Sequence, residues 1–268
     1  MKTGAVYLIG AGPGDPDLLT VKAARLLASA EIVLHDDLVP EAILSLAGPR
    51  ALRVSVGKRC GTKKITQAEI NQLIVEKARQ GLTVVRLKSG DPLVFGRAAE
   101  EMDALRTAGI AFEIVPGITA AFAAASALQC SLTDRRAASG IVFRSGHHAP
   151  DATADHICDP AAATRIVYMP GRDFTAIASE WRAEGLPPEF PCIAISHAAR
   201  PDQQITVTTL AALATTEPGP APVLLLAGWV FETIRSDAPG LQPLVRSALA
   251  ELEVAHQTGL LPVESPAK

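Results

Sequence analysis

The first 115 residues alternate between short apolar runs and longer amphipathic stretches. The apolar runs lack a clean apolar–polar alternation, which is typical of strands in a sheet covered on both faces. This pattern predicts strands at residues 6–9, 32–34, 52–56, 84–87 and 112–115, with helices at 18–28, 40–46, 67–79 and 98–107. Strands that alternate with helices indicate a parallel sheet. The third helix should begin with a capping box, because Thr66 is followed three residues later by Glu69.

The segment from Val115 to Gly117 predicts a hinge into a second half of the chain. An Ala-rich helix is expected at 119–128, followed by strands at 141–144, 165–169, 192–196, 205–208 and 223–227. Surface loops are expected at the Pro-containing stretches 150–160 and 215–222, and a helix beyond about residue 236. We therefore expect an α/β domain at residues 1–116, a second α/β domain at 117–245 and a C-terminal tail at 246–268.

Composition narrows the class of protein. Apolar residues make up 48% and aromatic residues only 4% of the chain, which favours a layered α/β protein. The net charge of −3 gives no support for nucleic acid as a partner. The apolar run at 6–9 is too short for a signal peptide or a membrane span. Four widely separated cysteines without CxxC pairing indicate reduced thiols in a cytoplasmic protein: Cys60, Cys130, Cys158 and Cys192.

A few residues could be mistaken for metal ligands. His147 and His148 are adjacent, and His156 lies close to Cys158. Neither group has a second ligand pair at zinc-like spacing, so we interpret them as exposed loop residues and expect no metal.

The first apolar run leads into the sequence GAGPGD at residues 10–15. A dinucleotide pyrophosphate needs free backbone N–H groups and no negative charge beside it. Here Pro13 and Pro16 remove two donors, and Asp15 and Asp17 add two carboxylates. The loop therefore fits a ligand with a cationic centre and no phosphate. The alternative is a tight turn with an ordinary N-cap Asp and no ligand.

The second informative segment is VVRLKSGDPLVFGRAAEE at residues 84–101. Its strand runs into a Ser-Gly-Asp-Pro turn, and a helix should begin close to Gly96 and Arg97. Gly90 permits close backbone approach to a ligand, and Asp91 can accept hydrogen bonds from it. Because function in parallel sheets lies where strand ends lead into loops, we predict a binding site here. The alternative for Asp91 is a simple Asp-Pro turn.

Taken together, these segments resemble the tetrapyrrole methylases, and within that family the uroporphyrinogen-III C-methyltransferases. The resemblance runs from about residue 6 to 230, and the order and spacing of its motifs make it specific. The matching segments are VYLIGAGPGDPDLLTVKAARLL, AEIVLHDDLV, VGKRCG, INQLIVEKARQGLTVVRLKSGDPLVFGRAAEE and VPGITAA.

The resemblance implies a two-domain α/β fold, with a parallel sheet in the N-terminal domain and a mixed sheet in the C-terminal domain. The active site would lie in the cleft between them, usually in a homodimer. The implied reaction transfers methyl groups from S-adenosylmethionine to two pyrrole carbons of uroporphyrinogen III. Its product, precorrin-2, is the branch point towards sirohaem and cobalamin. The small tetrapyrrole would be the partner, with neither nucleic acid nor membrane involved.

The same resemblance implies roles for individual residues. Asp36 matches the proposed proton acceptor and Lys58 the proposed proton donor of the family. The alternatives are a helix N-cap for Asp36 and a solvated surface charge for Lys58. The implied contacts with S-adenosylmethionine are Pro13, Ser89, Gly90, Asp91, Val94, Thr119, Ala120, Met169 and Ala198.

The substrate carries carboxylates around its rim, so several cations should line one wall of the cleft. We expect Arg59, Arg97 and Arg135 to make these contacts. Other basic residues are weaker choices, and about half of the whole set should be ordinary solvated charges. The weaker choices are Lys58, Lys63, Lys64, Arg136 and Arg144.

Four of the positions at which the chain departs from the family pattern bear most directly on the site. Ser89 and Ala198 stand where relatives carry Gly, Asp134 replaces a His and Arg136 replaces an Asp. These changes bear on the substrate pose and leave two alternatives open, another precorrin methyltransferase of the cobalamin pathway and a catalytically silent tetrapyrrole-binding paralogue. A nicotinamide-binding oxidoreductase is opposed by the acidic, Pro-containing first loop.

Overall fold

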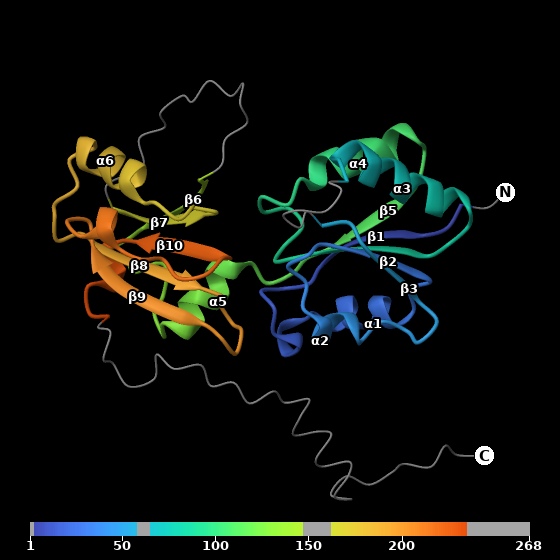
Figure 1. The fold of residues 1–268 in the computed structure, drawn as a ribbon, viewed down its shortest axis with the longest axis horizontal. Helices are drawn as coiled ribbons and strands as arrows, with labels where there is room; N and C mark the ends of the chain where they lie inside the picture. The colour runs from blue at the N-terminus through green and yellow to red at the C-terminus, as the bar shows by residue number, and fades with distance from the viewer. Residues whose placement is uncertain (1–2, 58–64, 147–161, 235–268) are drawn as a thin grey trace, which may run out of the picture.

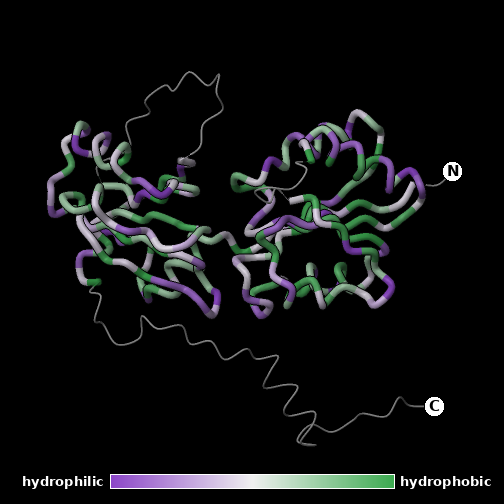
Figure 2. The backbone as a smooth tube through the Cα atoms, in the orientation of Figure 1, coloured by the Kyte–Doolittle hydropathy of each residue, from purple (hydrophilic) through white to green (hydrophobic). Residues whose placement is uncertain are grey.

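The computed structural model describes residues 3–57, 65–146 and 162–234. Two five-stranded sheets lie side by side, and the segment between β5 (Phe112–Val115) and α5 (Ala120–Ala127) joins them (Figure 1). Figure 2 shows hydrophobic stretches along the strands of both sheets. The expected two-sheet α/β fold is confirmed.

The N-terminal sheet is entirely parallel, with the strand order β3-β2-β4-β1-β5. Its remaining strands are β1 (Val6–Gly10), β2 (Ile32–His35), β3 (Leu52–Ser55) and β4 (Val84–Lys88). The chain leaves the neighbouring strands β1 and β4 towards opposite edges of the sheet. Ligands bind at the carboxyl ends of parallel strands beside such a reversal, so the loops after β1 and β4 are favourable positions for a site.

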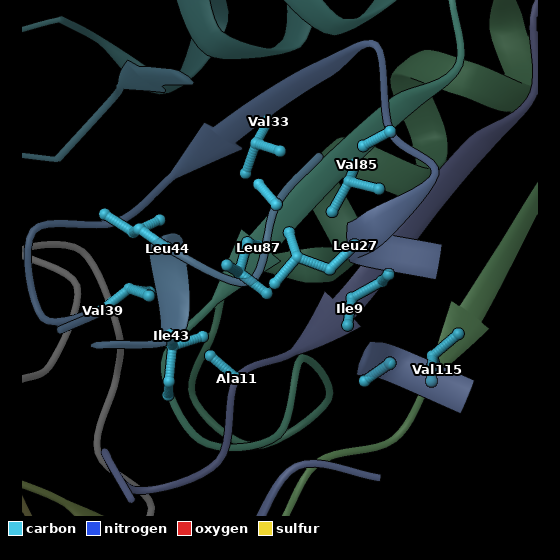
Figure 3. Packing of buried hydrophobic residues seen from close by; sticks show 13 residues of the cluster. Ile9, Ala11, Leu27, Val33, Val39, Ile43, Leu44, Val85, Leu87 and Val115 are labelled. Atoms are coloured by element: carbon cyan, nitrogen blue, oxygen red, sulfur yellow. The ribbon is translucent and has the colours of Figure 1, made fainter. Parts of the chain in front are cut away.

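Helices cover both faces of this sheet (Figure 1). One face carries α1 (Val21–Ala28) and α2 (Glu41–Leu44), and the other carries α3 (Gln67–Arg79) and α4 (Ala98–Thr107). In Figure 3, Leu27 of α1 and Ile43 of α2 lie against Ile9, Val85 and Leu87 of the sheet. These side chains are fully buried, which explains why the strands read as continuous apolar runs.

The C-terminal sheet is mixed, with the order β6-β7-β10-β8-β9. Only β6 and β7 pair in parallel, and the other neighbours are antiparallel. Helix α5 packs on one face, and α6 (Thr175–Ala183) packs on the other through the buried Trp181. The strands are β6 (Gly140–Ser145), β7 (Ala163–Tyr168), β8 (Pro191–Ser196), β9 (Gln204–Thr209) and β10 (Val223–Ala227).

The predicted bounds of α3, α4, β5 and β10 agree with the structure, and the Thr66–Glu69 capping box is present. The helix expected at 18–28 is shorter. Residues Pro16–Leu18 form a 3₁₀ turn, and α1 follows Thr20, whose hydroxyl accepts a hydrogen bond from the Ala23 N–H. The strand expected at 165–169 ends at Tyr168, and Met169 has a positive φ of 50°. Helix α6 was not predicted, and the loop at 150–160 and the helix beyond 236 lie outside the described residues.

Cys130 and Cys192 are free thiols, in agreement with the expectation, whereas Cys60 and Cys158 lie outside the described residues. Burial raises the pKa of the Cys192 thiol to about 12.

Within the described ranges, no helix combines the length and apolar character needed to cross a bilayer.

Replacing Leu27 with Ala should lower the free energy of unfolding by about 2–5 kcal/mol, because it leaves a cavity beneath α1. Val21 lies on the same helix but is 86% exposed, so Val21→Ala is the matched control and should change stability by less than about 0.5 kcal/mol. Chemical denaturation of both variants measures the difference. Equal losses would contradict the burial of α1 against the sheet.

Candidate functional site

A cavity of about 220 Å³ lies where the loops after β1, β2, β4 and β5 meet the end of β7, the end of β8 and the start of β10 in the C-terminal sheet. Both halves of the chain line it, so neither sheet alone forms the site. Ten positions selected from the sequence are among its lining residues: Pro13, Asp36, Ser89, Gly90, Asp91, Val94, Thr119, Ala120, Met169 and Ala198. The fold therefore brings to one place residues that are far apart in the sequence.

The loops after β1 and β4 are joined by backbone hydrogen bonds. The Gly12 N–H donates to the Gly90 carbonyl at 3.2 Å, and the Gly90 N–H donates to the Gly12 carbonyl at 2.7 Å. Asp15 accepts from the Asp17 N–H at 2.9 Å and caps the short 3₁₀ turn. The turn-capping interpretation is thus correct for Asp15, while Pro13 lines the cavity.

The Asp91 carboxylate connects two segments of the site. Its Oδ1 accepts from the Leu93 N–H at 2.8 Å, and its Oδ2 accepts from the Gly117 N–H at 3.0 Å. The first bond closes the turn after β4, and the second attaches this turn to the connection between β5 and α5. Asp91 therefore orders its own loop and also fixes the loop that leads into the second half of the chain.

Close backbone packing at the same point requires glycine. A Cβ atom on Gly10 would lie 2.5 Å from the Gly117 nitrogen, and one on Gly117 would lie 2.3 Å from the Gly90 oxygen. Gly90 has a φ of +68°, and a Cβ there would face open space, with only the Thr119 Cα at 4.0 Å. Since the positive φ belongs to Gly90, Ser89 fits the turn without strain.

Strained backbone conformations are concentrated around the cavity. Phe95 and Met169, which both line it, have φ values of 51° and 50°. Next to the lining residue Ala198, His197 and Ala199 have φ values of 53° and 59°. Bulky residues adopt this region at an energetic cost and do so mainly at functional sites.

The wall from the second half includes Tyr168, which the sequence analysis did not select. Its hydroxyl makes a 2.6 Å hydrogen bond with the Thr119 hydroxyl and accepts from the Ala121 N–H at 3.3 Å. Burial raises the pKa of this phenol, so it stays protonated. The Phe95 ring lies 5.0 Å from the Tyr168 ring between centroids, which continues the apolar wall across both halves.

Arg200 also lines the cavity and was not selected from the sequence. Its Nη2 donates to the Leu38 carbonyl at 2.6 Å, and its Nε lies 3.5 Å from the Pro13 carbonyl. The side chain thereby links the turn after β8 to two loops of the N-terminal sheet. Burial lowers the pKa of its guanidinium. Among the described residues that line the cavity, Arg200 is the only cation.

Asp36 follows β2 and lines the cavity, but it is not a helix N-cap. Pro40 occupies the N-cap position of α2 and makes no side-chain capping bond. The Asp36 carboxylate instead accepts from Arg86. The N-cap alternative is therefore wrong, because the tertiary ion pair takes the place of a local hydrogen bond.

Two of the cations selected for substrate binding, Arg97 and Arg135, do not line this cavity. Arg97 donates two hydrogen bonds to Glu100, at 2.7 and 2.8 Å, and Arg135 is exposed; neither is a lining residue. The hydrogen bond to Glu100 raises the pKa of Arg97. Lys58 and Arg59 lie outside the described residues. The role of these four residues stays a prediction.

The changed charges at 134 and 136 neutralise one another. Arg136 donates to both carboxylate oxygens of Asp134, at 3.0 and 2.7 Å. These bonds lower the pKa of the Asp134 carboxyl to about 2. Within the ranges that the structure describes, no group of three or more His, Cys, Asp or Glu residues could hold a metal ion.

A family model described as Tetrapyrrole (Corrin/Porphyrin) Methylases matches residues 5–214. The chain belongs to the tetrapyrrole methylase family. The uroporphyrinogen-III C-methyltransferase of Paracoccus denitrificans is 43% identical over 234 residues, which cover 85% of this chain and 81% of that protein.

Solved structures of other tetrapyrrole methylases are similar in fold. Uroporphyrin-III C-methyltransferase from Thermus thermophilus, complexed with S-adenosylhomocysteine, is 40% identical with a TM-score of 0.74, covering 85% of this chain and 98% of that one. Cobalt precorrin-4 methyltransferase is 30% identical with the same TM-score of 0.74, covering 84% of this chain and 95% of that one.

Replacing Arg200 with Met should loosen the two N-terminal loops that it contacts, because the bond to the Leu38 carbonyl is lost. We expect faster hydrogen–deuterium exchange in peptides that cover residues 12–18 and 36–40, measured by mass spectrometry. Arg172 is exposed and does not line the cavity, so Arg172→Met is the control and should leave both peptides unchanged. Unaltered exchange in the Arg200→Met variant would contradict the link between the halves.

Proposed function

We propose that this protein transfers methyl groups from S-adenosylmethionine to two pyrrole carbons of uroporphyrinogen III, giving precorrin-2. The observation that carries the proposal is the cavity, which gathers all nine positions expected to contact the methyl donor and the expected proton acceptor Asp36. The similarity to uroporphyrinogen-III C-methyltransferases over most of the chain supports the same substrate. A homodimer in the cytoplasm is part of this proposal.

The cavity fits the methyl donor better than a nucleotide diphosphate. Pro13 offers no N–H to a phosphate, and the carboxylates of Asp36 and Asp91 would repel one. The same two carboxylates attract a positively charged sulfonium. Gly90 lets a ligand approach the backbone, and Ser89 beside it also lines the cavity.

S-adenosylmethionine, when bound, supplies a methyl group that is already a strong electrophile. The protein therefore has two tasks, to hold the pyrrole carbon in line with the S–CH₃ bond and to accept the proton that the ring loses. Asp36 is the carboxylate placed for the second task, since it lines the cavity at the end of β2. Arg59, Arg97 and Arg135 are proposed to bind substrate carboxylates, and Lys58 is proposed to donate a proton.

Another precorrin methyltransferase is the second candidate function. It is favoured by the TM-score of 0.74 to cobalt precorrin-4 methyltransferase, which equals the score to the Thermus thermophilus structure. Similarity of fold therefore does not distinguish uroporphyrinogen III from a later precorrin as the substrate. Sequence identity does discriminate, because it is 40% to the Thermus thermophilus protein and 30% to the cobalt precorrin-4 enzyme.

Anaerobic incubation with uroporphyrinogen III and isotopically labelled S-adenosylmethionine tests the proposal. We expect a product whose mass increases by two methyl groups, measured by mass spectrometry. Transfer to a later, already methylated precorrin but not to uroporphyrinogen III would support the second candidate. Tight binding of S-adenosylhomocysteine without transfer to any tetrapyrrole would indicate a catalytically silent protein.

Asp91→Ala should weaken S-adenosylhomocysteine binding at least tenfold while thermal unfolding stays cooperative. The substitution removes the bonds to the Leu93 and Gly117 N–H groups, and one charge-assisted hydrogen bond contributes about 1.5 kcal/mol or more. Isothermal titration calorimetry measures the affinity. Asp103→Ala, which removes an exposed carboxylate on α4, is the control and should bind normally. Unchanged binding by Asp91→Ala would refute the role of this loop.

A further inference from the structure

A cluster of charged side chains lies inside the N-terminal half, directly behind the cavity. Arg86 and Lys88 of β4 have side chains that are each 3% exposed, and Glu101 of α4 is fully buried. The cluster reaches the cavity through Asp36, whose side chain is 31% exposed. Arg86, Lys88 and Glu101 do not line the cavity and have no part in the function proposed above.

Local structure explains how these residues meet. Residues at alternate positions of a strand project to the same face, so Arg86 and Lys88 both point towards the face that α3 and α4 cover. Glu101 lies on the inner side of α4, one turn before the buried Leu105. Both cations therefore meet the Glu101 carboxylate, to which Arg86 Nε donates at 2.9 Å and Lys88 Nζ at 3.0 Å.

The Arg86 guanidinium is fixed on all of its sides. Nε bonds to Glu101, while Nη1 donates to the carbonyls of Leu34 and Leu87, each at 3.2 Å. Nη2 donates to Oδ1 of Asp36. The other carboxylate oxygen of Asp36, Oδ2, has no hydrogen-bond partner among the described residues. Arg86 therefore holds one oxygen of Asp36 and leaves the second one available.

Stability alone does not explain the cluster. The free energy needed to take charged groups out of water exceeds the free energy of their attraction unless the geometry is excellent. Replacing a buried ion pair with well-packed apolar side chains therefore often leaves the protein equally stable. Glu101 Oε2 is buried and has no hydrogen-bond partner within the described part of the chain, which adds a further free-energy cost. Burial and the Arg86 charge lower the pKa of Lys88, whereas the carboxylates of Asp36 and Glu101 overcome burial and raise the pKa of Arg86. The arrangement thus keeps a charged guanidinium beside Asp36.

We propose that Arg86, held in place by Glu101, is a positioning residue that aims Oδ2 of Asp36 into the cavity to accept the proton lost by the methylated tetrapyrrole. The inference rests on the proposed function. In this step the proton leaves the cationic ring and bonds to Oδ2, and the electron pair of the broken bond remains on the ring. The ring loses its added charge, and the Asp36 carboxylate becomes neutral.

A double-mutant cycle tests whether Arg86 acts through Asp36. Asp36→Asn should lower kcat for methyl transfer by about 10²–10⁴-fold, the usual contribution of a positioned base. Arg86→Gln should lower kcat at least tenfold, with the KM for uroporphyrinogen III and the affinity for S-adenosylhomocysteine within about twofold of wild type. The double variant should then be no slower than Asp36→Asn, within about threefold, because the two residues act as one unit.

Arg86→Gln leaves Glu101 paired with Lys88, so no single charge is stranded in the interior. If this variant does not fold, Glu101→Gln takes its place in the cycle, since it keeps the volume and one oxygen acceptor for Arg86. Arg86→Lys should recover part of the lost kcat. As a control, Arg165→Met breaks the ion pair between Arg165 of β7 and Glu184 at the C-terminal end of α6; neither residue lines the cavity, so kcat should be unchanged.

Each outcome decides the proposal. If the wild type is active and the losses in kcat of the two single variants multiply in the double variant, the positioning role of Arg86 is overturned. The proposed function would still stand. A change in KM or in S-adenosylhomocysteine affinity without a change in kcat does the same, because it would indicate a structural role. A wild-type protein that transfers no methyl group overturns the proposed function, and the positioning role with it.

Discussion

The hydrogen bond from the Gly117 N–H to the Asp91 carboxylate is the contact on which the site depends. It joins the loop after β4 to the connection between the two sheets, at the point where Gly10, Gly90 and Gly117 pack backbone to backbone. Without side chains at these glycines, the ends of β1 and β4 and the start of the second half come within contact distance. The cavity lies beside this point and is lined from both halves, so its shape follows from the approach of these three segments.

Two of the residues that complete the site come from the C-terminal half, and neither was selected from the sequence. The spacing of apolar residues along the sequence correctly predicted α3 and α4, and the two loops of the N-terminal half were also recognised, because these features depend on local sequence patterns. Tyr168 and Arg200 follow no such pattern, since only the pairing of distant strands brings them to Thr119 and Leu38. The N-cap alternative for Asp36 failed for the same reason, since Arg86 lies 50 residues away in the chain. Long-range contacts carry no short-range signal.

Negative charges outnumber positive charges in the described lining of the cavity. The described lining of the cavity contains two carboxylates and one guanidinium, although the proposed substrate carries carboxylates. Arg97 is occupied by Glu100, and Arg136 by Asp134, so neither offers its full hydrogen-bonding capacity in this state. Exposed pairs of this kind contribute little to stability. A substrate carboxylate that replaced Glu100 on Arg97 would therefore exchange one weak pair for another, and recognition would depend on geometry more than on net charge.

Two of the departures expected from the sequence, Ser89 and Ala198, lie in the lining of the cavity, where other contacts hold the backbone. Ala198 lies between His197 and Ala199, whose positive φ values would be costly without support. His197 contacts Asp202 at 2.5 Å and the Ala221 carbonyl at 2.6 Å, and the Ala199 N–H donates to the Gln203 side chain at 2.8 Å. These bonds fix the segment on both sides of Ala198. The methyl group of Ala198 thus adds apolar surface to the cavity wall at a position where the local conformation is already determined by its neighbours.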